Sequence, residues 1–251
     1  MAIDDGVATL QLELNAGARA AIDVHARLLR AWNAQINLTA LRQPKQVAVG
    51  HVLDSLSALP LLRRLPAHAS LLDIGSGGGF PGVPLAAALP AVECALVDSV
   101  AKKARFLTVA AAAVTTAMIT AGQPAPSFQV LAQRADDLAG DDRHRQQWGC
   151  VVARAVGSLA EVIELGLPLL QVGGRLIAWK SDSSDGSLQR ELDASRGILR
   201  IIGGRVEEIV AVAANLDAAL RDHVLVVVHK ERSTPNGFPR PPAERRRALL
   251  T

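Results

Sequence analysis

Short apolar runs alternate with longer helical patterns over most of the chain. The apolar runs predict seven strands, at residues 70–74, 92–98, 128–132, 149–153, 174–179, 205–212 and 223–229. Helical patterns lie between several of them, at residues 81–89, 158–170 and 188–202 and from about residue 101. This alternation is typical of a doubly wound α/β sheet of the Rossmann-like type. The last two strands are joined by a connection too short for a clear helix, which predicts that they pair antiparallel.

The first part of the chain has a helical pattern only. Residues 16–35 carry a stripe of large apolar side chains at helical spacing, and residues 44–59 make a second helix. We therefore expect residues 1–69 to form an N-terminal helical extension packed on a sheet domain of residues 70–230. Residues 231–251 follow as a basic C-terminal tail.

The most specific segment joins the first strand to its helix. From Leu71 to Gly82 it reads Leu-Leu-Asp-Ile-Gly-Ser-Gly-Gly-Gly-Phe-Pro-Gly, with Asp73 near the end of the apolar run. Pro81 suits the first turn of a helix. Glycines permit a backbone with positive φ and let a ligand approach without a Cβ in the way. The glycine turn, residues 75–80, therefore predicts a nucleotide-like cofactor, and the alternative is an ordinary strand-to-helix turn.

Two cofactors compete for the glycine turn. Gly77-x-Gly79-x-x-Gly82 fits the dinucleotide fingerprint, and Asp98 follows at the ~20-residue spacing expected for a ribose contact. The other cofactor is S-adenosylmethionine (SAM), whose turn reads acid, apolar, Gly-x-Gly-x-Gly, as residues 73–79 do. A carboxylate at Asp73 would repel a pyrophosphate but balance the ammonium and sulfonium of SAM. We therefore favour SAM, with Asp73, Gly75 and Gly77 among its contacts.

Polar residues follow the predicted strands at the edge where a doubly wound sheet binds its ligand. Asp98 ends the second strand, where its carboxylate could accept both ribose hydroxyls or cap the next helix. Ser99 is also placed to cap that helix. Arg134-Ala135-Asp136 follow the third strand. Arg154 follows the fourth, and a charge so close to the core predicts a contact with cofactor or RNA.

Composition limits the classes of protein. With 251 residues, of which 49% are hydrophobic and 20% charged, the chain can bury one substantial core. It has no run of ~18 apolar residues and no signal-peptide pattern, so we expect a soluble cytoplasmic protein without membrane contact. Cys94 and Cys150 lie in predicted strands and are expected to be reduced core residues. The scattered histidines predict no metal site.

Positive charge gathers near the C-terminus. Residues 230–247 hold six basic and two acidic residues, a net charge of +4 against +3 for the whole chain. Four prolines and a glycine in the same stretch predict an extended or mobile tail. Arg245, Arg246 and Arg247 could bind phosphate backbone, or the tail could only add solubility.

A series of motifs comes in the order found in one enzyme family. They are Asn37-Leu38-Thr39-Ala40, His51-x-x-Asp54-Ser55, the Asp73–Pro84 loop, Asp98-Ser99-x-x-Lys102-Lys103-x-Arg105-Phe106-Leu107, Arg154-Ala155 and Trp179-Lys180. Over about residues 31–230 the chain resembles the RsmG (GidB) family, bacterial methyltransferases that use SAM to modify guanine N7 in 16S rRNA.

This resemblance implies a seven-stranded SAM-dependent methyltransferase sheet. It further implies cofactor contacts at Gly75, Phe80, Ala135, Asp136 and Arg154, and a 16S rRNA or small-subunit precursor as the partner. Two features depart from the family pattern. Gly78 stands where a proline is common, and the connection at residues 115–126 is longer and rich in alanine, which leaves open the edge of the adenine pocket.

The segment after the fourth strand agrees with chemistry at a ring nitrogen. Residues 153–157 read Ala-Arg-Ala-Val-Gly, unlike the Asn/Asp-Pro-Pro-aromatic motif common in enzymes that methylate exocyclic amines. Neither cysteine is placed to attack a pyrimidine C5. Guanine N7 already carries a nucleophilic lone pair and loses no proton. We therefore expect catalysis by proximity and orientation, with no catalytic general base.

Eight residues are predicted to contact the RNA. They are Asn37, His51, Lys102, Arg105, Lys180, Arg245, Arg246 and Arg247. His51, one turn before Asp54, could instead belong to a polar cluster between the helical extension and the sheet. The lysines and Arg105 could equally form a solvated face.

Two other functions stay open at this point. One is a nicotinamide-dependent oxidoreductase, although a chain without tyrosine cannot carry the Tyr-Lys pair of short-chain dehydrogenases. The other is a non-catalytic RNA-binding ribosome assembly factor that keeps a methyltransferase fold. We expect the protein to act as a monomer.

Overall fold

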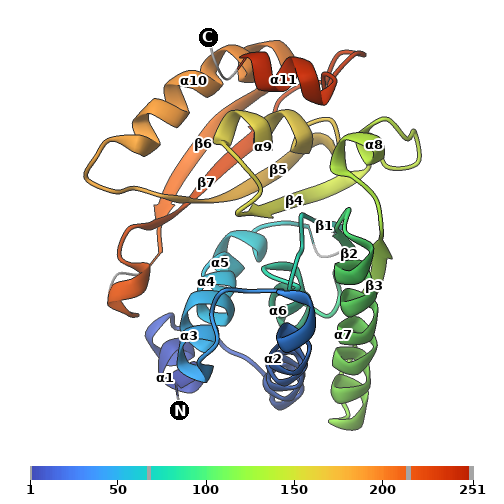
Figure 1. Ribbon diagram of the computed structural model, residues 1–251, viewed down its shortest axis with the longest axis vertical. Coiled ribbons are helices and arrows are strands. Elements are labelled where there is room, and N and C mark those ends of the chain that lie inside the picture. Colours follow the sequence, from blue (N-terminus) through green and yellow to red (C-terminus); the bar gives the residue numbers. More distant parts are fainter. Residues whose placement is uncertain (1, 67–68, 213–215, 249–251) are drawn as a thin grey trace.

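The computed structural model of the chain describes residues 2–66, 69–212 and 216–248 (Figure 1). Seven strands form one sheet: β1 (Leu71–Ile74), β2 (Glu93–Val97), β3 (Ser127–Leu131), β4 (Trp148–Arg154), β5 (Leu170–Ser181), β6 (Gly204–Ala211) and β7 (His223–Lys230). Their order is β3-β2-β1-β4-β5-β7-β6. The five strands from β3 to β5 run parallel, and β7 lies antiparallel to both β5 and β6. The predicted doubly wound sheet and the antiparallel last pair are both confirmed.

Alternating side chains of the strands face two separate apolar layers. In β1, Leu71 faces one layer while Leu72 and Ile74 face the other. The first layer is filled by α6 (Gly82–Ala88), α7 (Ala101–Thr120) and the N-terminal helices. The second is filled by α8 (Ala135–Ala139), α9 (Leu159–Gly166) and α10 (Ser187–Ile202). Helices thus cover both faces of the sheet, and the ends of the strands stay uncovered by them.

The N-terminal helices gather at one end of the molecule, against α6 and α7 (Figure 1). They are α1 (Ala2–Thr9), α2 (Ala16–Ile36), α3 (Pro44–Val47), the π-helix η1 (Ala48–Leu53), α4 (Asp54–Leu56) and α5 (Leu59–Leu62). The predicted helix at residues 16–35 is confirmed. The helix predicted at 44–59 is confirmed over residues 44–56, but its middle, Ala48–Leu53, is a π-helix. Such wide turns are frequent at functional sites.

The C-terminal tail is folded against the body of the protein. After a short 3-10 turn, η2 (Ala218–Leu220), and β7, the chain ends its described part in α11 (Pro242–Ala248), beside α9 and α10 in Figure 1. Lys230 at the end of β7 is fully buried, and its Nζ donates to the carbonyls of Leu167 and Leu170. The helix at Pro242–Ala248 differs from the predicted extended or mobile tail. Residues 249–251 and the side chains of Arg246 and Arg247 lie outside the described part.

Candidate active site

The glycine turn requires glycine at its first position. Gly75 has a φ of 72°, and a Cβ there would lie 2.8 Å from Cγ2 of Val156. Gly77 and Gly79 also have positive φ. Ser76 fixes the turn to its neighbour strand, because its Oγ donates to the carbonyl of Asp73 and accepts from the amide of Val97. The turn is thus held rigidly at the ends of β1 and β2.

Asp98 connects the glycine turn to the start of α7. One carboxylate oxygen accepts the amide of Gly77 at 3.0 Å, and the other accepts the amide of Val100 at 2.8 Å. The predicted cap by Ser99 is wrong, since Asp98 receives the amide at the helix start and no side chain caps α7. A carboxylate offers about four acceptor positions. Two of them are used here, so Asp98 keeps acceptor capacity for a ligand.

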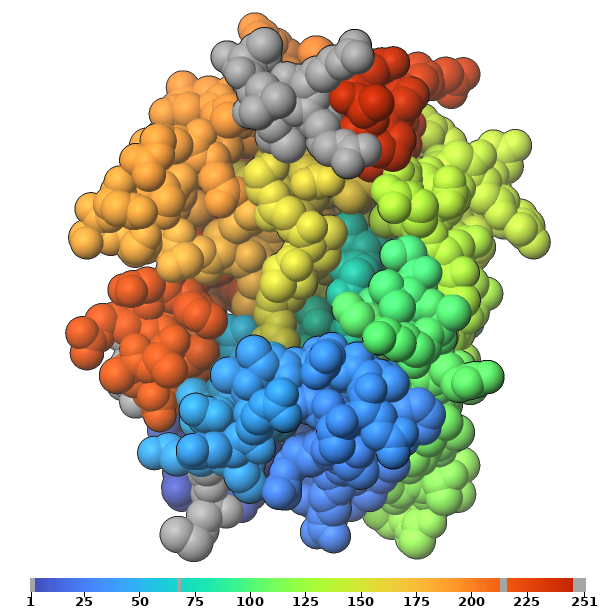
Figure 2. Space-filling view, viewed as in Figure 1, coloured from blue at the N-terminus to red at the C-terminus, as the bar shows by residue number. Residues whose placement is uncertain are grey.

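A cleft of about 330 Å³ opens beside the glycine turn, where the strand order reverses between β1 and β4. We call it the strand-end cleft. In Figure 2, teal atoms of the glycine-turn region lie recessed between the green start of α7 and the yellow segment that follows β4. The lining residues include Gly75, Asp98, Lys103, Ala135, Asp136, Ala155 and Arg245. The structure therefore brings four of the predicted cofactor residues together: Gly75, Asp98, Ala135 and Asp136.

Ala155 gives one wall of the strand-end cleft an unusual backbone. It adopts the left-handed conformation, with a φ of 57°. For an alanine this conformation costs roughly 1–2 kcal/mol, because Cβ crowds the following carbonyl. Strain of this kind concentrates at ligand sites, where the surrounding structure holds it in place.

Asp73 and Phe80 are not among the residues that line the strand-end cleft. The Asp73 carboxylate is fully buried and accepts the amide of Gly82 at 2.9 Å, at the start of α6. Burial raises its pKa to about 7, partly offset by that hydrogen bond. Phe80 packs between the imidazoles of His25 and His51, with ring centroids 4.6 and 4.7 Å away. Oδ2 of Asp73 thus supports the start of α6, while Oδ1 makes no hydrogen bond to the described residues.

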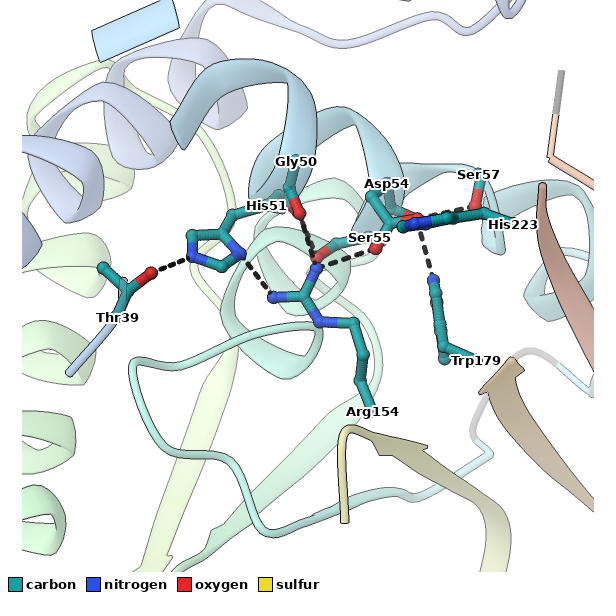
Figure 3. Close-up of polar contacts among 9 residues, drawn as sticks. All are labelled: Thr39, Gly50, His51, Asp54, Ser55, Ser57, Arg154, Trp179 and His223. Atoms are coloured by element: carbon teal, nitrogen blue, oxygen red, sulfur yellow. Dashed lines mark hydrogen bonds and ion pairs between the residues drawn. The ribbon is translucent and has the colours of Figure 1, made fainter. Parts of the chain in front are cut away.

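Arg154 is the centre of a buried polar cluster, which we call the Arg154 network (Figure 3). Its guanidinium donates to the carbonyl of Gly50 at 3.0 Å, to the Asp54 carboxylate at 2.8 Å and to Nδ1 of His51 at 2.8 Å. Gly50 and His51 lie in the π-helix, where the wide turn presents a carbonyl to the guanidinium. His223 from β7 contacts the other carboxylate oxygen of Asp54 at 2.9 Å. The Arg154 side chain therefore turns toward the N-terminal helices.

The two histidines of the Arg154 network are shifted in opposite directions. Burial, and then the charge of Arg154, lowers the pKa of His51 to about 4. This agrees with the geometry, because Nδ1 accepts from Arg154 and Nε2 lies 2.6 Å from the hydroxyl of Thr39. The hydrogen bond to Asp54 raises the pKa of His223. His51 thus lies in the polar cluster between helical extension and sheet that was its alternative interpretation.

Apart from His51, the predicted RNA residues whose side chains the structure describes fall into two groups. Asn37, Lys102 and Arg105 are exposed, and Lys103 lines the strand-end cleft. Lys180 is turned inward, because its Nζ donates to the carbonyl of Gly157 and pairs with Glu191 at 2.6 Å.

Arg245 is also turned inward, with only 4% of the residue exposed and an ion pair to Asp136. For Lys180 and Arg245 the structure differs from the expected exposed, phosphate-binding side chain.

Two supporting residues gave no recognisable signal in the sequence. His25 lies on the apolar face of α2, and its Nε2 contacts the carbonyl of Gly78 at 2.8 Å. Asn33 accepts the amides of Leu38 and Thr39 and donates to the carbonyl of Thr39. His25 thus supports the glycine turn, 53 positions away in the sequence. Asn33 supports the loop that follows α2, through backbone groups at no regular spacing.

The two cysteines lie in the hydrophobic core. Cys94 and Cys150 are buried free thiols, as predicted. Within residues 2–66, 69–212 and 216–248, no three His, Cys, Asp or Glu side chains are grouped so that they could hold a metal ion. Over the same residues, no helix is long and apolar enough to cross a membrane.

The topology and the strand-end cleft place the protein in the class of Rossmann-like methyltransferases, with five parallel strands and an antiparallel last pair. More closely, the chain belongs to the GidB family, rRNA small subunit methyltransferase G, whose profile matches residues 19–215. The resemblance found in the sequence is thereby confirmed.

Two relatives carry the name ribosomal RNA small subunit methyltransferase G. The protein of Symbiobacterium thermophilum is 34% identical over 95% of this chain and 92% of its own length. That of Pelotomaculum thermopropionicum is 40% identical over 84% of this chain and 81% of its own. Among solved structures, PH0793 of Pyrococcus horikoshii shares the fold with a TM-score of 0.51, at 12% identity over 71% of this chain and 64% of that one.

Proposed function

We propose that the protein transfers a methyl group from SAM to N7 of a guanine in 16S rRNA. The observation that carries this proposal is the strand-end cleft, at the point where strand order reverses and with a carboxylate at the end of β2. Membership of the rRNA small subunit methyltransferase G family supports the substrate.

The residues of the strand-end cleft fit a cofactor with a ribose and a purine. Asp98 has spare acceptor capacity for ribose hydroxyls, and Gly75 keeps the turn free of a side chain. Asp136 presents a second carboxylate, suited to an exocyclic amine. The volume of about 330 Å³ lies within the range of small-molecule sites. When bound, SAM supplies an electrophilic methyl group on its sulfonium.

The residues of this chain would act by holding and shielding the reactants. Guanine N7 needs no general base, and the titratable groups of the Arg154 network are occupied by one another. Catalysis would then come from orientation of N7 and exclusion of water.

The RNA would reach the strand-end cleft over exposed basic residues at its edge. Lys102 and Arg105 lie at the start of α7, next to Lys103 in the cleft wall, and Asn37 lies exposed at the end of α2. A-form helices hide guanine N7 in a deep, narrow groove, so the target base should come from a loop. We infer a cytoplasmic protein that acts on 16S rRNA or a small-subunit precursor.

The test is transfer of labelled methyl from SAM to small-subunit rRNA, with the modified base mapped by cleavage at 7-methylguanine. Naked 16S rRNA and small subunits that lack the modification should be compared as substrates. We expect one labelled guanine. SAM binding without transfer would favour a non-catalytic assembly factor, and binding of NAD instead of SAM would favour an oxidoreductase.

A further inference from the structure

The C-terminal tail supplies one wall of the strand-end cleft. Arg245 in α11 lines the same cleft as Asp98 and Asp136, although more than a hundred residues separate it from either. Its guanidinium lies beneath the surface, with a side-chain exposure of 5%. The match to the family profile ends at residue 215, so this wall lies outside the matched segment.

Asp136 is held between two arginines. Arg134 donates to both of its oxygens, at 2.9 and 3.1 Å, and Arg245 donates to Oδ2 at 2.9 Å. Burial alone would raise the pKa of Asp136, but the hydrogen bonds from Arg134 and Arg245 lower it to about 2. The Arg134 side chain is about half exposed while that of Arg245 is buried. Arg134 has the larger influence on the carboxylate through its two hydrogen bonds, and Arg245 holds Oδ2 from the buried side.

The tail is fastened to α9, so the position of Arg245 is well defined. Arg240 donates through its guanidinium to both oxygens of Glu164, and its amide donates to one of them at 2.8 Å. Glu164 itself is buried in α9. Arg245 in turn donates to the carbonyl of Arg240. A continuous set of charge-assisted hydrogen bonds therefore runs from α9 through the tail to the strand-end cleft.

One polar atom in this set has no partner. The Nε of Arg245 is buried and makes no hydrogen bond to any of the residues that the structure describes. A buried donor without a partner costs free energy. The contacts of Arg245 are made by its two terminal nitrogens, one to the Asp136 carboxylate and one to the carbonyl of Arg240.

We infer that Arg245 is a positioning residue of the cofactor site, an inference that rests on the proposed function. It fixes the Asp136 carboxylate to accept a hydrogen bond from the exocyclic amine of the cofactor's purine. An ionised carboxylate attracts an amine but repels a carbonyl oxygen. The site should therefore prefer adenine over hypoxanthine, and the preference should depend on Arg245.

Calorimetry on the full chain with S-adenosylhomocysteine and its inosine analogue tests this inference. We expect Arg245→Ala to weaken binding of S-adenosylhomocysteine about tenfold and to reduce the preference for adenine. Arg245→Lys, which keeps the charge but not the fork of donors, should recover part of both. In methyl transfer, KM for SAM should rise while kcat at saturation is kept. Arg143→Ala, which breaks an exposed Arg–Asp pair, is the matched control and should change none of these quantities.

Three results would decide against the inference. Unchanged affinity and purine preference in a folded Arg245→Ala would overturn it. If that variant does not fold, unchanged values in Arg245→Lys would do the same. A flatter salt dependence of RNA binding, with unchanged cofactor affinity, would assign Arg245 to the RNA. Failure of the wild type to bind either SAM or S-adenosylhomocysteine would instead refute the proposed function itself.

Discussion

The strand-end cleft and the Arg154 network both lie where polar residues follow the strands, but their carboxylates are used differently. Asp98 in the cleft accepts two backbone amides and keeps acceptor capacity toward the opening. Asp54 in the network is 1% exposed, and its oxygens are taken by Arg154 and His223. Asp98 can serve a ligand because it lines the cleft and pairs only with neutral backbone amides. Asp54 begins α4 and pairs with side chains from β4 and β7, so it fastens the N-terminal helices to the sheet.

The largest effect is expected from Asp54→Ala. Removal of this carboxylate leaves Arg154 and His223 without their partner, and loss of one member of a buried ion pair costs about 3–5 kcal/mol. Urea unfolding should show a loss of that order, while the affinity of the remaining folded protein for S-adenosylhomocysteine stays within about twofold. A large change in affinity without loss of stability would place the Arg154 network in the cofactor site and remove the distinction between the two regions.

Asp98→Ala should have the opposite profile. Hydrogen bonds to a charged group are worth about 1.5–3 kcal/mol, so SAM binding should weaken roughly 10- to 100-fold. Asp98→Asn is the matched variant, because its remaining oxygen can still accept one of the amides of Gly77 and Val100. Calorimetry on both variants, with circular dichroism as a check of the fold, measures the effect. An unchanged affinity would reduce Asp98 to a support for the glycine turn.

The pH dependence of stability can separate the two histidines of the Arg154 network. His51 is neutral in the folded protein, with its pKa lowered to about 4 against 6.5 when unfolded. The unfolded chain therefore binds more protons between pH 6.5 and about 4, so stability falls as pH falls through that range, by up to ~1.4 kcal/mol per pH unit. His51→Asn, which can still accept from Arg154, should flatten this fall in urea titrations.

His223→Asn is the control for that experiment. The raised pKa of His223 gives a stabilisation that is present below pH 6.5 and lost as pH rises through the folded pKa. Its replacement should therefore lower stability below pH 6.5, remove the fall in stability between pH 6.5 and the raised folded pKa, and leave the slope of the profile below pH 6.5 unchanged. Identical profiles for the two variants would contradict the assignment of a neutral His51.

The smallest effects are expected at the exposed edge of the strand-end cleft. Lys102→Ala and Arg105→Ala should each weaken RNA binding a few-fold and make the slope of log K against log salt less negative by about 0.7–0.9. Lys180→Ala should leave the slope unchanged, because its ammonium pairs with Glu191 and a carbonyl. If the wild type and all three variants had equal salt slopes, the RNA would have to contact another surface of the protein.

The elements of the sheet could be predicted because apolar runs are local signals. Strand β1 was placed within one residue, whereas β5 begins at Leu170 rather than 174, because Gly173 and Gly174 imitate a break. The π-helix could not be foreseen, since the helical pattern of residues 44–59 is continuous. Prolines in the tail suggested an extended chain, but α11 begins at one of them, where proline is tolerated.

The site residues also divide into those with a local sequence signal and those whose position depends on long-range packing. Gly75 and Asp98 could be predicted because the residues next to them in the sequence already indicate a tight turn and the end of a strand. Arg154 and Arg245 were both recognised as important, but the direction of each guanidinium depends on carboxylates 100 and 109 positions away in the chain. No spacing rule reaches so far. Only the packed structure shows that Arg154 faces the helices and Arg245 the strand-end cleft.

The left-handed backbone at Ala155 has a consequence for how this protein can be altered. Glycine adopts that conformation without crowding, so Ala155→Gly removes a standing penalty from the native state. Glycine also has more conformational freedom in the unfolded chain, which offsets part of this gain in stability. The methyl group of Ala155 limits the conformations of the cleft wall, and glycine would not. The Ala155→Gly variant is therefore expected to bind its ligand more weakly, because the wall of the cleft is less fixed.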